Sequence, residues 1–155
     1  MNHYIQPTVP EAAVLAVRLG AGNTLADRFT AADVGKIVKL GGESAYVMAV
    51  RGNDIEGQVT SVEAQQNGFS IGGVQEQGRM RVKFDGLQAT VGVGAVAVGD
   101  YVVAAAQPAL GVKLVDFPAV CKATDASTSN IKWRVVSLGT VGTGAVGTVG
   151  VIARI

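Results

Sequence analysis

Apolar residues recur along this chain in short runs interrupted by glycine, asparagine, aspartate or proline, and few stretches follow the period of about 3.6 residues of a helix. The segment RMRVKF shows the shorter period most clearly, because Arg79, Arg81 and Lys83 alternate with apolar residues. Successive side chains of a strand point to opposite faces of a sheet. The segment therefore predicts a strand with one basic face and one apolar face.

Other segments share the same character: they are short, rich in β-branched residues and bounded by turn-forming residues. With RMRVKF, the predicted strands are GKIVKL, SAYVMAV, EGQVTSVEA, DYVVAAA, GVKLV, IKWRVVSL and VGVIARI. Turn sequences such as RGND, QNG, FDG and VGD occur at the close spacing typical of barrels and sandwiches. We therefore predict an all-β protein whose body is a small β-barrel or sandwich of short strands.

At most one or two short helices are expected. The segment PEAAVLAVRL begins with Pro10, which suits a first helical turn, but its valines make a strand equally compatible. The segment TAADVG offers Thr30 as an N-cap and Gly35 as a stop, which predicts a single short turn of helix.

The chain is divided at residue 33. Residues 1–32 are predicted to form an N-terminal arm together with the helix or strand of PEAAVLAVRL, and the first ten residues, with two prolines, are expected to be extended. Residues 33–155 are predicted to form the β-rich domain. Within it, DVGKIVKL (33–40) and AVGDYVVA (97–104) share a Val-Gly turn that leads into a strand. The sequence leaves open whether these two segments belong to two similar subdomains or to one barrel.

The composition adds a prediction about contacts. Only 16% of the 155 residues are charged and 48% are apolar, with a mean hydropathy of +0.34, whereas an average domain has about 25% charged residues. We expect much of the surface to be buried against other chains. Because 13 basic residues balance 12 acidic ones, and each apolar run is shorter than about 18 residues, neither nucleic acid nor membrane is an expected partner.

Few residues in the sequence can support catalysis or metal binding. A single cysteine, Cys121, excludes an intrachain disulfide and a cysteine metal cluster. The one histidine, His3, lies at the tip of the predicted arm, where no nucleophile–histidine pair can be built unless the arm is ordered elsewhere. The segment GTGAVG (142–147) matches a dinucleotide-binding pattern, but a Gly- and Val-rich stretch follows it and no acidic residue occurs after Asp125. Asp54 and Glu56 are most simply exposed acids at a hairpin. We predict no enzyme activity and no catalytic, cofactor or metal-binding residues.

Four segments, taken in order, resemble the strand signatures of capsid decoration (cement) proteins of tailed bacteriophages. They are DIEGQVTSVEA, GRMRVKFDG, VAVGDYVVAA and GTVGTGAVGTVGVIARI. The resemblance covers roughly residues 33–155. It implies a structural virion protein that is made in the bacterial host cytoplasm and binds the outer surface of the phage capsid.

The resemblance also implies partners. Such proteins bridge subunits of the major capsid protein and gather as homotrimers at three-fold and quasi-three-fold positions, where they stabilise the mature shell. Candidate contact residues lie in the arm and on the basic strand face: Tyr4, Ile5, Pro7, Val9, Pro10, Arg79, Arg81 and Lys83. The alternative is another phage structural subunit, such as a tail tube or head fibre protein.

Overall fold

The computed structural model describes residues 14–20, 25–41, 45–64, 70–125, 127 and 129–155. Its helical elements include two short 3-10 turns, η1 (Leu25–Asp27) and η2 (Ala31–Asp33). The strands are β1 (Val14–Leu19), β2 (Ile37–Leu40), β3 (Ala45–Met48), β4 (Gly57–Ala64), β5 (Ser70–Gln75), β6 (Arg79–Leu87), β7 (Tyr101–Ala104), β8 (Ala119–Lys122), β9 (Trp133–Ser137) and β10 (Val149–Arg154). The predicted all-β class is confirmed.

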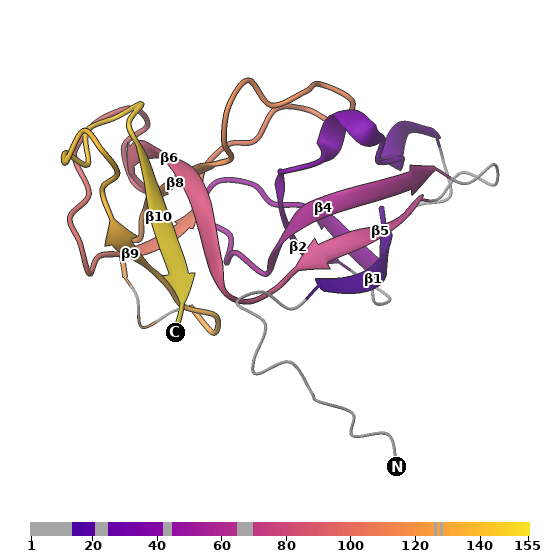
Figure 1. Ribbon diagram of the computed structural model, residues 1–155, viewed down its shortest axis with the longest axis horizontal. Coiled ribbons are helices and arrows are strands. Elements are labelled where there is room, and N and C mark those ends of the chain that lie inside the picture. The colour runs from indigo at the N-terminus through magenta and orange to yellow at the C-terminus, as the bar shows by residue number, and fades with distance from the viewer. Residues whose placement is uncertain (1–13, 21–24, 42–44, 65–69, 126, 128) are drawn as a thin grey trace, which may run out of the picture.

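The strands form two closed barrels of five strands each, which lie side by side in Figure 1. The first barrel contains β1 to β5 in the ring order β1-β3-β2-β4-β5, and the second contains β6 to β10 in the order β6-β8-β7-β9-β10. Each ring has a single parallel pair, β1 with β3 and β6 with β8, and its other pairs are antiparallel. The two halves of the chain therefore repeat one topology.

The repeat extends to the register of individual residues. In the first barrel Val38 pairs with Gly57, and in the second Val102 pairs with Trp133 at the corresponding place. The fourth strand of each barrel shifts register against the fifth after an equivalent valine, Val59 or Val135. A shared bulge and a shared register show that the barrels are two copies of one structural unit.

The two Val-Gly segments occupy the same position in the two copies. Gly35 N donates to Val59 O at 2.7 Å, and Gly99 N donates to Val135 O at 2.8 Å. The φ angles of these glycines are 91° and 92°, in the left-handed region that glycine adopts without a steric penalty. Of the two alternatives left open by the sequence, the structure has two similar subdomains.

Three details of the strand prediction need correction. GVKLV (111–115) is irregular, although it was predicted to be a strand, and two strands, β5 and β8, were not predicted. The described part of PEAAVLAVRL is the strand β1, because its backbone pairs with β5 along its whole length.

The turn predicted in TAADVG is confirmed: Thr30 caps η2, with its side chain accepting from Ala32 N.

The division at residue 33 does not coincide with a boundary in the structure. β1 closes the first barrel between β3 and β5, so Val14–Leu19 belong to the first barrel. The change from one barrel to the other falls instead between β5 and β6, near Gly78.

The apolar core of the second barrel extends into the first half of the chain. The larger core is centred on the second barrel, on residues such as Phe84 and Trp133, but it also includes Ile37, Ala49 and Ile55 from the first half of the chain. As predicted, the apolar face of RMRVKF points inward: Met80, Val82 and Phe84 are all buried.

Candidate functional site

The barrels meet at a junction where each sends a connection onto the other. We define the junction as the β3–β4 connection (49–56), the β7–β8 connection (105–118) and the surfaces they contact. Figure 1 shows the orange β7–β8 connection crossing from the second barrel toward η2 in the first. The β3–β4 connection runs the other way: Gly52 N donates to Ala104 O at 2.9 Å, and Trp133 Nε1 donates to Ile55 O at 2.8 Å.

Arg51 fixes the β3–β4 connection to β6 and the residue beyond it. Its guanidinium is 2.5 Å from Asp85 Oδ2, and it also donates to the carbonyl oxygens of Leu87 and Gln88. A planar group with several donors suits this cluster of acceptors. Arg51 is therefore engaged in holding the barrels together.

A buried ion pair lies under the opposite connection. Lys36 Nζ is 2.6 Å from Asp33 Oδ1 and donates to Ala109 O at 2.7 Å, while Gly111 N donates to the same carboxylate at 2.9 Å. Both side chains are fully buried. Burial alone would raise the pKa of Asp33, but the Lys36 ammonium and the backbone N–H groups of Thr30 and Gly111 hold that pKa below its usual value.

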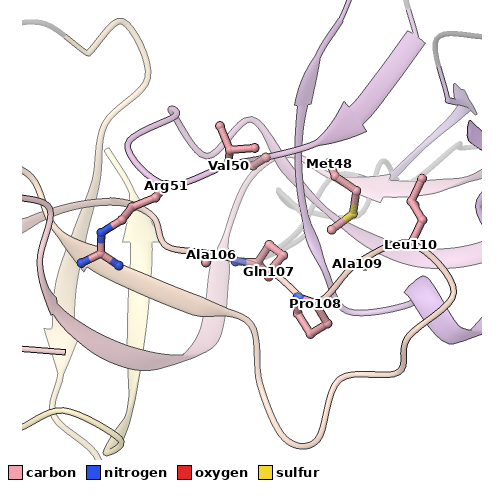
Figure 2. A pocket seen from close by; sticks show the side chains of 9 residues that line it. Met48, Val50, Arg51, Ala106, Gln107, Pro108, Ala109 and Leu110 are labelled. Atoms are coloured by element: carbon pink, nitrogen blue, oxygen red, sulfur yellow. The ribbon is translucent and has the colours of Figure 1, made fainter. Parts of the chain in front are cut away.

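A pocket of about 300 Å³ opens between the two connections (Figure 2). Its lining is mostly apolar, and Met48 and Leu110 both pack against the core of the first barrel. Gln107 closes one side, where its amide nitrogen donates to Ala105 O and Ala119 O. Arg51 extends away from the other lining residues. The arrangement can receive an apolar side chain and supplies no nucleophile, acid or base.

The basic face predicted on β6 lies on the outside of the second barrel. Lys83 Nζ is 3.0 Å from Asp116 Oδ2, and the Arg81 guanidinium carbon lies 5.5 Å from the centre of the Phe117 ring. Arg79 is also exposed. A hollow of about 490 Å³ lies beside Arg81 and Phe117. The structure thus brings the three basic residues onto one outer face, where the β7–β8 connection partly neutralises them.

The other predicted contact residues, Tyr4, Ile5, Pro7, Val9 and Pro10, lie outside the described residues. His3 does so too.

The second barrel has an uncharged tip, which we define as residues 88–99 between β6 and β7 and residues 138–148 between β9 and β10. Neither segment contains a charged residue. Asp100, which follows the first segment directly, accepts from Ala97 N and lies 3.0 Å from Lys122 Nζ at the base of the tip. The segments touch, since Val96 N donates to Gly144 O at 3.0 Å. Its exposed valines, with their exposed fractions, are Val91 (68%), Val93 (55%), Val98 (62%), Val141 (65%) and Val146 (42%). This surface was not singled out from the sequence, although the absence of charge in both segments was visible there.

The glycines of GTGAVG serve the geometry of this tip. Gly142 and Gly147 have positive φ angles, and a Cβ on Gly144 would lie 1.8 Å from Val96 O. The segment leads into the strand β10 and not into a helix. These glycines therefore serve turns and close backbone packing.

The remaining candidate groups are separated or buried. Asp54 accepts from Asn130 N and Glu56 accepts from Leu40 N, so these two acids bind backbone N–H groups. Burial raises the pKa of the Cys121 thiol to about 11. No group of His, Cys, Asp or Glu side chains suited to a metal ion occurs within the described residues. None of the helices in the same residues is long and apolar enough to cross a membrane.

Comparisons of this chain with protein-family models, with curated proteins and with solved structures found no match.

Proposed function

We propose that this protein is a structural virion protein that binds the outer surface of a bacteriophage capsid and stabilises the mature shell by bridging major capsid protein subunits. The proposal rests on the resemblance of four of its segments to capsid decoration proteins. It includes assembly as a homotrimer at three-fold and quasi-three-fold positions.

The observation that carries the proposal is the combination of low charge with exposed apolar side chains. Large apolar residues are exposed on both barrels and on the β7–β8 connection, including Leu40, Val115 and the valines of the uncharged tip. Isolated exposed apolar residues are ordinary, but contiguous patches usually mark interaction surfaces. A chain with 16% charged residues that exposes five valines on two touching segments is suited to lasting contacts with other proteins.

The basic face of β6 supplies a contact of a different kind. Arg79, Arg81 and Lys83 share one exposed surface, which suits an acidic surface on a shell subunit. Binding only to the assembled shell stabilises that shell by mass action. Each small interface therefore adds to the free energy that keeps the shell closed.

The test is a pelleting assay with mature shells stripped of their decoration protein. Purified protein is added in increasing amounts and the bound copies per shell are counted. Saturation at three copies per three-fold position, with increased resistance of the shell to heat, is the expected result. Protein that stays in the supernatant, or that forms tubes without a shell, would contradict the proposal, and tubes would support the tail alternative.

The variant R79E/R81E tests the proposed shell contact. We expect at least about tenfold weaker shell binding, because the substitutions reverse the charge of an exposed face. The matched control is K113E/K132E, which changes the net charge equally but lies outside the basic face. Equal loss of binding in both variants would show that only net charge matters.

A further inference from the structure

We propose that the uncharged tip of the second barrel is the surface through which copies of this chain associate with one another. This inference rests on the proposed function and assigns its homotrimer contact to specific residues.

The tip is a formed surface. Leu87 N donates to Val93 O at 2.8 Å, and Gly147 N donates to Phe84 O at 2.8 Å, so both segments are tied to β6 or its end. Val96, between the exposed valines, is buried in the core of the second barrel. The exposed valines are therefore held in place before any partner binds, and little conformational entropy is lost on association.

The repeat shows that the turn at Gly35, which corresponds to the turn at Gly99, is partly covered in the first barrel. There, the turn at Gly35 lies under the β7–β8 connection: a Cβ on Gly35 would be 3.1 Å from Leu114 Cδ1, and Lys36 beside it donates to Ala109 O. In the second barrel, a Cβ on Gly99 would meet no heavy atom within 4 Å, and Val98 is 62% exposed. The turn of the first barrel is thus partly covered, with Val34 still 40% exposed, and the turn of the second barrel is more open.

The charge pattern points to a second copy of this chain as the partner. Near the axis of a symmetric oligomer, each side chain lies close to its own counterparts in the other copies. A charged residue there would face like charges, whereas the valines of residues 88–99 and 138–148 face other valines. The basic face of β6 has the opposite property, because Arg79 and Arg81 would repel their own copies and suit a different partner.

Sedimentation velocity measured over a wide range of protein concentration tests the inference. Wild-type protein is expected to sediment as an oligomer. In V93D/V141D the dissociation constant is expected to rise at least about tenfold for each aspartate, because association would bury uncompensated carboxylates. The matched control V112D/V115D places the same charges on exposed valines of the β7–β8 connection (54% and 92% exposed) and should behave as wild type.

Three outcomes would overturn the inference: a wild-type protein that is monomeric throughout the range, a V93D/V141D variant that sediments as wild type, or a control that dissociates equally. The emission of Trp133, which is fully buried, verifies that each variant is folded. V91K, at the most exposed valine of the tip, repeats the test with the opposite charge.

Pelleting the same variants with shells separates this inference from the proposed function. A monomeric V93D/V141D that still binds shells retains the proposed function and confirms the tip as the self-association surface. A wild-type protein that associates through the tip but does not bind shells would refute the proposed function alone.

Discussion

Asp33 illustrates how much of a residue's role is local and how much depends on distant residues. The sequence TAADVG predicts its neighbourhood, a short turn capped by Thr30. The position of its ion-pair partner Lys36, three residues on, is also local. The two backbone groups that also bind this ion pair are distant in sequence: Lys36 donates to Ala109 O and Gly111 N donates to Asp33, each across more than seventy residues. No local pattern indicates that contact, so the burial of the pair could not be predicted.

The Asp33–Lys36 pair is expected to be important for stability. D33N leaves a fully buried ammonium without its carboxylate, and such a loss costs about 3–5 kcal/mol of unfolding free energy. The exposed pair Lys83–Asp116 provides the control, since D116N should cost less than about 1 kcal/mol. Urea denaturation of the two variants measures the difference. A cost for D33N no larger than that for D116N would contradict the role assigned to the pair.

The pair also predicts a pH dependence. Because the folded-state pKa of Asp33 is lowered, its stabilising contribution is complete above the unfolded pKa of about 3.9 and is lost as the pH falls through the folded-state value. The stability difference between wild type and D33N should therefore shrink on acidification below about pH 4. Denaturation midpoints measured across this range check it, and a constant difference would contradict it.

At the scale of strands, β5 was missed where glycines replace β-branched residues, whereas β10 was predicted although it contains Gly150, and GVKLV is irregular although it contains two valines. β5 contains Gly72, and a Cβ there would lie 2.1 Å from Ser61 O; in the second barrel a Cβ on Gly150 would lie 2.5 Å from Ser137 O. Both glycines sit at the repeated bulge, where the backbones approach closely. The sequence shows glycines that weaken a strand, and only the pairing explains why they are required.

The first ten residues are expected to contribute to shell binding and not to folding. Deleting residues 1–10 leaves β1, which begins at Val14, intact. The truncated chain should have the unfolding midpoint of the full chain but bind shells more weakly, because an extended arm can add a strand to a sheet edge of a neighbouring subunit. Circular dichroism and the pelleting assay measure the two properties. Unchanged shell binding would exclude this role.

At the scale of the whole molecule, the exchange of connections makes each barrel part of the other's fold. Arg51 binds acceptors in and just beyond β6, and Leu110 packs against the core of the first barrel. The weak sequence echo between DVGKIVKL and AVGDYVVA, which left a structural repeat open, corresponds to a repeated element in the structure. It could not reveal that the repeated units are interlocked, because the connections that join them, 49–56 and 105–118, have no common pattern.

Interlocked barrels are expected to unfold together. Emission of Trp133 in the second barrel and circular dichroism of the whole chain should give coincident urea transitions. R51A removes the hydrogen bonds to Asp85 and the nearby carbonyls, so it should lower the unfolding free energy by about 1–3 kcal/mol and shift both signals equally. Separate transitions in the wild-type chain would show that the barrels fold independently.

Closure of both sheets has a consequence for a chain so poor in charge. An open sheet edge offers unpaired backbone groups on which further strands can grow into fibres, and a closed barrel removes that template. Each described sheet of this protein is closed. Contacts between copies of the chain would therefore be made by side chains and not by backbone strand pairing. The shapes and number of those side chains would limit how many copies can join. Apolar surface on such a scaffold favours assemblies of fixed size over open-ended aggregation, even where many copies are crowded together.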